Sequence, residues 1–224
     1  MVLSDKLYIC AGRTIKQADE NTAAVLFRPI ADLLLNKSIL VAGGKEYRIA
    51  EIEFYLRTEK HNDETTHNND RQKKFGEWYI HRKGRSESSQ YCFYYSGGID
   101  ICLGCGNIPF GVLMRSAVCI SDNVKIKSGP IRMLRVLLHD IFGDGFPNAP
   151  VLKDKERFQE CCGIIEFTGA FQKNKHLYLK PADLEKKEII WCPRTFGTEK
   201  NLTGWKAKKY KARIFQTTSI GLHS

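Results

Sequence analysis

The segment Arg48–Leu56 (RIAEIEFYL) constrains the fold of this chain more than any other feature of the sequence. Its apolar residues recur at every second position, which is the period of a β-strand. One face, which we predict to lie in the core, consists of four apolar residues: Ala50, Ile52, Phe54 and Leu56. The other face carries Glu51, Glu53 and Tyr55. Because acidic side chains are mostly exposed in proteins, we expect this second face to meet water or a cleft.

The segments around this strand predict a helix, a hairpin and a loop. The helix is expected at about residues 28–36, and a strand follows at Ser38–Val41. Gly43-Gly44 then turns the chain into the strand Lys45–Leu56. The polar segment Arg57–Gln72 has no periodicity, so we predict a long exposed loop of the kind that often carries function.

The rest of the chain predicts more strands and a second helix. The predicted strands are Trp78–His81, Ser89–Tyr95, Asp100–Cys105 and Gly111–Ala117. Ser128-Gly129-Pro130 precedes Ile131–Phe142, and a proline with a nearby serine is typical of a helix N-terminus. The elements together predict a mixed α+β fold on an antiparallel sheet, with residues 1–224 forming a single domain.

Composition limits the partners and the compartment. The 224 residues carry a formal net charge of +10, which favours polyanions, although charge alone does not separate a nucleic-acid binder from a basic protein without such a partner. No apolar stretch is long enough to cross a membrane and the first residues lack a secretory signal, so we expect a cytoplasmic protein. The eight cysteines are expected to be reduced thiols. Cys102-Leu-Gly-Cys105 has metal-like spacing, but no second such pair exists, and we expect no metal.

The face of Glu51, Glu53 and Tyr55 has two readings. The first is a solvated strand face with two surface glutamates. The second is a cleft in which a partly desolvated carboxylate accepts a proton from water beside an aromatic stacking platform. The strand alone favours the first reading, and the motifs that follow it favour the second.

Five short motifs, in a fixed order, give the chain a family resemblance. They are FRPIADLLLNKSILV (27–41), EIEFYL (51–56), DETTH (63–67), VLMR (112–115) and SGP (128–130) followed by a basic helix. In this order they resemble the opening helix and strand, the E-T-E-A-Y strand, the D-E-A-A-H loop, the V-L-[LI]-R strand and the G-P helix start of the alkyladenine (methylpurine) DNA glycosylase family. The resemblance spans residues 20–215 and implies that family's curved antiparallel β-sheet with flanking helices.

The resemblance implies a reaction and residues to perform it. Members of this family flip an alkylated or deaminated purine out of duplex DNA and hydrolyse its N-glycosidic bond, because the sugar carbon is unreachable inside the stack. By position, Glu53 would activate the water and Arg115 would hold that carboxylate. Tyr55 would stack on the flipped base and His67 would line the other side of its pocket. The implied enzyme is a monofunctional glycosylase that needs no cofactor and acts as a monomer on damaged double-stranded DNA.

The predicted strand Ser89–Tyr95, with the hairpin-like turn signal Gly97-Gly98 after it, departs from the family pattern. The family has Y-x-x-Y-G, in which the first tyrosine is a second stacking wall and the next one fills the gap left by the flipped base. Here the wall would be Phe93 or Tyr94, and the filling position falls on Ser96 or Gly97, with Tyr95 as a substitute if the tip is rebuilt.

A downstream asparagine that screens bases in the family also has no equivalent. Its position falls on Leu103 or Gly104, and Asp100 has no family counterpart. The departures together favour altered lesion preference over a copy of the family's activity.

The remaining DNA contacts are predicted from basic segments and a helix start. Ser128 and Gly129 precede a helix whose exposed amides suit a phosphate. Lys208 and Lys209 belong to Trp205–Arg213, which with Arg71–Phe75 interleaves cations and aromatic rings. Two alternatives remain open: a damaged-DNA-binding module on the same fold that does not cut, and a hydrolase of free nucleosides or small glycosides.

Overall fold

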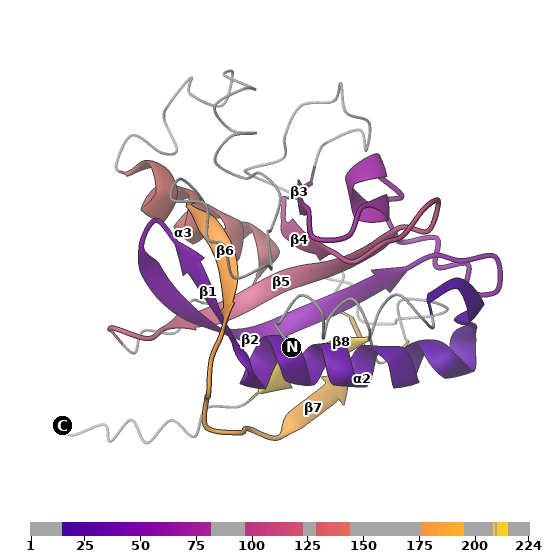
Figure 1. Ribbon diagram of the computed structural model, residues 1–224, viewed down its shortest axis with the longest axis horizontal. Coiled ribbons are helices and arrows are strands. Elements are labelled where there is room, and N and C mark those ends of the chain that lie inside the picture. Colours follow the sequence, from indigo (N-terminus) through magenta and orange to yellow (C-terminus); the bar gives the residue numbers. More distant parts are fainter. Residues whose placement is uncertain are drawn as a thin grey trace.

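Eight strands form one antiparallel sheet, which is the centre of the molecule (Figure 1). The computed structural model describes residues 15–81, 97–122, 129–143, 176–194, 208 and 210–214. The strands are β1 (Ser38–Ala42), β2 (Lys45–Leu56), β3 (Trp78–Ile80), β4 (Ile99–Cys102), β5 (Phe110–Cys119), β6 (Leu177–Pro181), β7 (Ile189–Cys192) and β8 (Lys211–Ile214). The helices are α2 (Glu20–Asn36) and α3 (Pro130–Phe142), with 3-10 turns η1 (Ile15–Gln17) and η2 (Asp70–Lys73). The α+β class and the antiparallel sheet are confirmed.

The strand β2 organises this sheet. The main strand order is β3-β4-β5-β2-β1-β6, and β8 also pairs with β2 and carries β7 on its other edge. Every pairing is antiparallel. The strand β2 has twelve residues, and two strands pair with one of its edges: β1 at one end and β8 near the middle. The strand β5 pairs with most of the other edge. A strand with three partners has few unpaired backbone groups, which suits a position at the centre of the fold.

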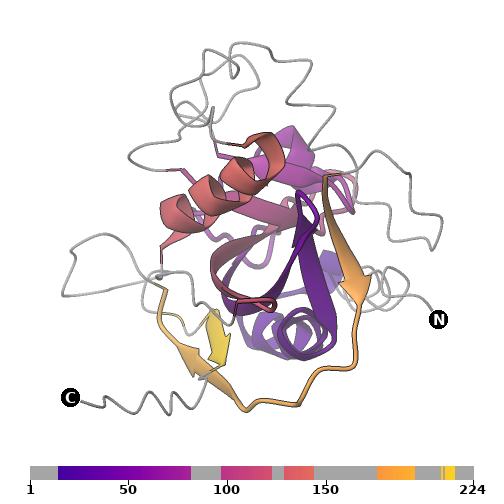
Figure 2. The same ribbon diagram turned by 90° about the vertical axis from the view of Figure 1, so that its left-hand side faces the viewer.

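The helix α2 covers the apolar face of β2. Figure 2 shows the sheet curled around α2, which is seen end-on, with α3 outside the curl. The Phe27 ring stacks on Phe54 with centroids 4.5 Å apart, and Tyr210 meets Phe27 edge-on at 5.1 Å. The predicted core residues of β2 are buried as expected, since Ile52, Phe54 and Leu56 are all 0% exposed. Period-2 alternation therefore identified this face correctly.

The helix α2 begins at Glu20, well before the predicted start near residue 28. Asp19 is its N-cap: the Asp19 carboxylate accepts hydrogen bonds from the backbone N–H groups of Asn21 at 2.9 Å and Thr22 at 2.8 Å, and the Thr22 hydroxyl caps the Asp19 N–H in return. This reciprocal cap satisfies donors that a helix start otherwise leaves unpaired.

The segment Arg57–Gln72 is not the exposed loop that its polarity predicts. His61 and Asp63 are 0% exposed, and Thr66 and Gln72 are also buried. His61, Asp63 and Gln72 make side-chain hydrogen bonds to the sheet, to Arg194 or to loop atoms, so these parts of the loop pack inside the fold, whereas Glu59 and Lys60 are exposed. The predicted strand Ser89–Tyr95 lies outside the described residues. Within the described residues, no helix has the length and apolarity that a membrane crossing requires.

Candidate functional site

The Glu53 carboxylate lies at the centre of a buried polar group on the sheet face opposite α2. Glu53 is 0% exposed. Its Oε2 accepts a hydrogen bond from the Tyr55 hydroxyl at 3.0 Å and another from Arg115 Nη1 at 3.2 Å. Tyr55 follows two residues later on the same strand, whereas Arg115 comes from the neighbouring strand β5. The structure thus brings together three of the residues that the sequence singled out.

The first reading of this face, a solvated strand face with two surface glutamates, is wrong, because cations from two other strands cover Glu51 and Glu53. Glu51 is 7% exposed, and its Oε1 lies 3.3 Å from Lys211 Nζ on β8 and 3.7 Å from Arg115 Nε on β5. The pairing of Glu51 with Arg213 and of Glu53 with Lys211 brings the basic strand β8 alongside the acidic one. Two acids and two bases therefore compensate one another inside the fold, which makes the burial of the carboxylates tolerable.

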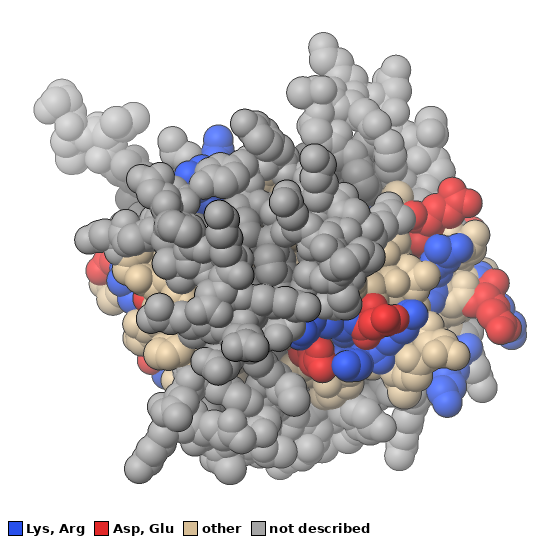
Figure 3. All heavy atoms as spheres, turned by 90° about the horizontal axis from the view of Figure 1, so that it is seen from above, with Lys and Arg blue, Asp and Glu red and all other residues tan. Residues whose placement is uncertain are grey.

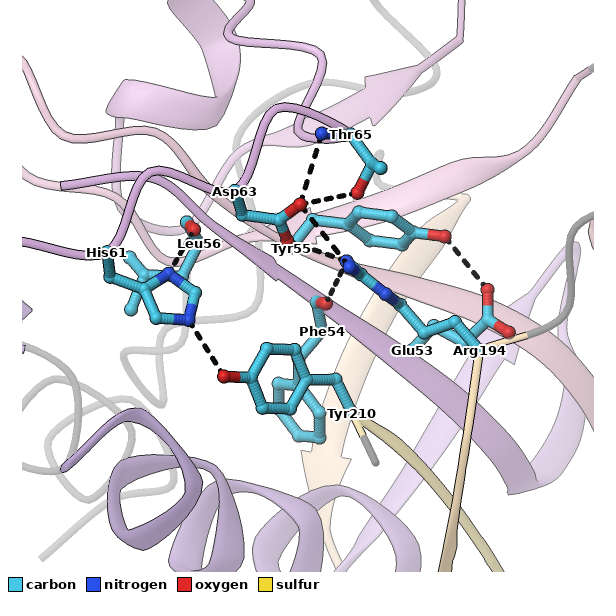
Figure 4. A network of polar contacts seen from close by, with 9 residues as sticks. All are labelled: Glu53, Phe54, Tyr55, Leu56, His61, Asp63, Thr65, Arg194 and Tyr210. Atoms are coloured by element: carbon cyan, nitrogen blue, oxygen red, sulfur yellow. Dashed lines mark hydrogen bonds and ion pairs between the residues drawn. The ribbon is translucent and has the colours of Figure 1, made fainter. Parts of the chain in front are cut away.

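Tyr55 is placed between an acid and a cation. Figure 4 shows its hydroxyl directed at Glu53 and its ring beside Arg194. The Arg194 guanidinium carbon lies 4.7 Å from the ring centroid, within the range of a cation–π contact. Burial, followed by the charge of Glu53, raises the pKa of Tyr55 well above its ordinary value. The phenol stays protonated at neutral pH and donates to Glu53.

Arg194 and Asp63 form a fully buried ion pair beside Tyr55 (Figure 4). Arg194 Nη1 donates to Asp63 Oδ2 at 2.6 Å and to the Phe54 carbonyl at 3.2 Å, and Nη2 lies 3.3 Å from Asp63 Oδ1. Asp63 also accepts hydrogen bonds from the backbone N–H and the hydroxyl of Thr65. One carboxylate thus ties the loop after β2 to the chain after β7.

The same network continues to His61 and Tyr210. The Leu56 carbonyl, 2.8 Å from His61 Nδ1, can only accept, so Nδ1 carries the proton. His61 Nε2 then accepts from the Tyr210 hydroxyl at 3.0 Å. Burial lowers the pKa of His61 and raises the pKa of Tyr210 to about 12. Both groups are uncharged at neutral pH and serve to fix the loop against β2 and β8.

His67 lies over β3, in a second polar cluster. Its Nδ1 is 3.1 Å from the Tyr79 hydroxyl, and its ring centroid is 4.3 Å from that of His81. His81 in turn contacts Asp100 on β4, with Nε2 and Oδ1 2.9 Å apart. The structure therefore places His67 beside a carboxylate–histidine pair that the sequence did not assign. Among the described residues, no group of three or more His, Cys, Asp or Glu side chains is placed to bind one metal ion.

Of the residues expected to contact DNA, the structure describes Gly97, Gly129 and Lys208. Gly97 is buried just before β4, and the Gly129 N–H donates to the Arg115 carbonyl at 2.9 Å, which links the start of α3 to the Glu53 group. Lys208 lies on the α2 side, where its Nζ is 2.7 Å from Glu20. The other candidates lie outside the described residues: Phe93, Tyr94, Tyr95, Ser96, Ser128 and Lys209.

The basic stretches do not form one phosphate-binding surface among the described residues. Lys211 is buried against Glu51, and Arg71 lies 3.4 Å from Glu77. From above, the described cations and carboxylates are intermixed (Figure 3). Lys211 belongs to the stretch Trp205–Arg213 that was predicted to contact DNA, and its pairing with the buried Glu51 does not fit a solvated or phosphate-binding role.

Comparison with known proteins identifies a relative. No model of a known protein family matches the chain. An uncharacterized protein of Acanthamoeba polyphaga mimivirus is 30% identical to this chain over a 214-residue alignment. The match covers 86% of this chain and 87% of the viral protein. The chain belongs to the family of this mimivirus protein. The name of this relative assigns it no activity.

Sequence reasoning missed three members of the site in this mimivirus-type protein. Asp63 belongs to the DETTH motif, which was considered only as a family match, and Arg194 lies outside the segments to which the sequence assigned a role. His81 ends a predicted strand and received no role. One signal was available for Asp63: a carboxylate seven residues after a buried strand, with two threonines close behind it, is typical of a capped turn that packs on that strand.

Proposed function

We propose that this protein is a monofunctional DNA glycosylase, which extrudes an alkylated or deaminated purine from duplex DNA and hydrolyses its N-glycosidic bond with water activated by Glu53. The observation that carries the proposal is that Tyr55 and Arg115 both donate hydrogen bonds to the same carboxylate oxygen of Glu53. These are the residues that the glycosylase resemblance assigns to the water, the stacking platform and the carboxylate clamp.

The geometry suits a base that acts on water. Arg115 Nη1 and the Tyr55 hydroxyl fix the orientation of the Glu53 carboxylate from two directions. A positioned carboxylate that takes a proton from water as the C1′–N9 bond breaks supplies about 10²–10⁴ in rate. Because Arg194 occupies one side of the Tyr55 ring, the purine would stack on the other side.

Burial sets a condition on this mechanism. Glu53 is 0% exposed, so a nucleotide reaches it only when elements above the carboxylate move apart on binding. Gating of this kind is common where an enzyme must exclude bulk water during a hydrolysis. The net charge of +10 would supply the long-range attraction to the phosphates.

The test is base release from duplexes that each carry one hypoxanthine, ethenoadenine or 7-methylguanine. Alkali converts the resulting abasic sites to strand breaks, which are counted on a denaturing gel. Glu53→Gln keeps the shape of the side chain and removes its basicity, so release should fall by about 10²–10⁴. Glu185→Gln, at a side chain that is 77% exposed, is the matched control and should retain full activity. Equal release by wild type and Glu53→Gln would remove Glu53 from the reaction.

One observation favours a second candidate, a module that binds damaged DNA without cutting it. The pairing of Glu53 with Arg115 and Tyr55 also describes a structural ion pair, which fixes β2 against β5 and takes no part in chemistry. This candidate predicts tight binding, with log K falling by several units per log unit of salt, but no base release from any lesion. Release of even one lesion that depends on Glu53 would exclude it.

A further inference from the structure

A buried cation covers one face of the Tyr55 ring. The Arg194 guanidinium carbon lies 4.7 Å from the centroid of the Tyr55 ring and 5.5 Å from that of Tyr210. Hydrogen bonds to Asp63 and to the Phe54 carbonyl hold the guanidinium in this place (Figure 4). Because Arg194 is 1% exposed, a ligand cannot reach the Tyr55 ring from this side.

The opposite face of the ring is the one that a base can use. Tyr55 is half-buried, whereas Glu53, Arg115 and Arg194 are buried. The hydrogen bond from the Tyr55 hydroxyl to Glu53 fixes the orientation of the ring. A flat base that stacks on Tyr55 therefore lies opposite Arg194, with the ring between the base and the guanidinium.

The field of Arg194 acts on this stacking platform. Burial and then the charge of Glu53 raise the pKa of Tyr55, and the charge of Arg194 opposes that rise. The cation is therefore felt at Tyr55 although it belongs to an ion pair. The acids that could offset it are already engaged: Glu53 is paired with Arg115, and both oxygens of Asp100 on β4 accept hydrogen bonds from neighbouring side chains.

We propose that Arg194 is a specificity-determining residue, which makes the Tyr55 platform select neutral purines over cationic ones. The inference rests on the proposed glycosylase function and names the class of lesion that its pocket favours: hypoxanthine and etheno adducts, rather than N-alkylated cations such as 7-methylguanine. An aromatic ring attracts a cation through the electrons of its face. At Tyr55 the guanidinium already draws on those electrons and repels a second cation across the ring, whereas a neutral purine stacks without that cost.

The distance between the two charges sets the size of the effect. A stacked purine has its ring about 4.5 Å or more from the Tyr55 centroid, which places its charge roughly 9 Å from Arg194. At an effective dielectric constant of about 20, two unit charges at that distance change a ratio of dissociation constants by about 20-fold. The opposite charge of Asp63 cancels part of this, so we expect a net effect of at least about 5-fold.

The test compares two bases that share a shape and differ in charge. 7-Methylguanine is cationic, whereas 7-deaza-7-methylguanine has carbon in place of the charged ring nitrogen and is neutral. Each base is placed once in the same duplex on a 2′-fluorinated sugar, which slows base release. Fluorescence anisotropy then gives the Kd of the full chain for each duplex, and the measured quantity is the Kd for the cationic base divided by the Kd for the neutral base.

Two variants of the ion pair should move this ratio in opposite directions. Asp63→Asn keeps the Arg194 cation and removes its counter-charge, so the ratio should rise. Asp63→Ala/Arg194→Met removes both charges, so the ratio should fall by at least about 5-fold. Lys37→Gln, at a side chain that is 55% exposed after α2, is the control and should leave the ratio unchanged. A general loss of stability weakens the binding of both duplexes together and does not produce opposite shifts.

The outcomes separate this inference from the proposed function. A ratio that does not fall in the double variant, or tighter binding of the cationic duplex by the wild-type protein, would overturn the role of Arg194. If the double variant does not fold, a lower ratio in Asp63→Asn overturns that role and a higher one supports it.

Base release is measured in parallel from duplexes with ordinary sugars that carry hypoxanthine or 7-methylguanine. Release combined with a ratio that is the same in all variants would overturn the inference while the glycosylase function stands. Release of neither base by the wild-type protein, with no preference for damaged over undamaged duplex, would overturn both.

Discussion

Replacing Asp63 by Asn should destabilise this protein more than any single surface change of charge. The variant keeps the size of the side chain but leaves the Arg194 guanidinium buried without its counter-charge, since both side chains are 0% exposed in the ion pair. Breaking a buried pair on one side costs about 3–5 kcal/mol in the free energy of unfolding. For a chain of this size, that loss lowers Tm by roughly 6–20 °C.

The measurement is equilibrium unfolding in urea, followed by both circular dichroism and tryptophan fluorescence. Asp70→Asn is the matched control, because Asp70 is 75% exposed in its ion pair with Lys73. Exposed pairs contribute about 0–1 kcal/mol, so this control should stay within that range of wild type. Coincident transitions by the two probes would justify the two-state treatment of both variants.

A double variant separates the ion pair from the local turn. The double variant Asp63→Ala/Arg194→Met removes both charges. Its loss in the free energy of unfolding should be smaller than the sum of the losses of the two single variants by about 3 kcal/mol. The hydrogen bonds that Thr65 donates to Asp63 are lost both in the Asp63→Ala single variant and in the double variant, so they cancel in the cycle. If Asp63→Asn costs no more than Asp70→Asn, the guanidinium is solvated and the account of this network is refuted.

Two further predictions concern the β1–β2 turn and the loop histidine. Gly43→Ala should cost at least about 2 kcal/mol more than Gly44→Ala in urea unfolding. Both glycines have positive φ, but only at Gly43 would the new Cβ meet the Asp140 carbonyl oxygen, at 1.8 Å, and equal costs would disprove the clash. For His61, the folded state binds a proton less readily than the unfolded state, whose pKa is about 6.5, because burial lowers the folded value. The free energy of unfolding should therefore be highest above pH 6.5 and decrease as the pH falls below it; His61→Gln should flatten this dependence, and an unchanged slope would exclude His61 as its source.

Local periodicity predicted the strands and helices well where one face is apolar. The bounds of β2 were predicted as Lys45–Leu56 and observed as such, because alternation and the Gly43-Gly44 turn specify both ends. The start of α2 was missed because Asp19 and Thr22 cap the helix well before its apolar stripe becomes dense. Capping is a side-chain contact of a few residues and leaves little trace in hydrophobic periodicity.

The candidate site was predicted in part, for a physical reason. Glu53, Tyr55 and Arg115 were singled out by position in the glycosylase resemblance, whereas the alternation of β2 by itself placed only Glu53 and Tyr55 on one face. Arg194 received no role and Lys211 was grouped with the basic stretch Trp205–Arg213, because a sequence shows charge but not the distant acid that compensates it. Which acid meets which base depends on the pairing of β2 with β8, and strand pairing across most of a chain is not specified by any local pattern.

That long-range pairing has a consequence for how the protein is made. The ribosome synthesises β2 long before β8, so a growing chain presents Glu51 and Asp63 before Lys211 and Arg194 exist to neutralise them. During that interval the middle of β2 is an open edge, able to pair with another nascent chain. The ion pairs of Asp63 with Arg194 and of Glu51 with Lys211 therefore form only late in translation.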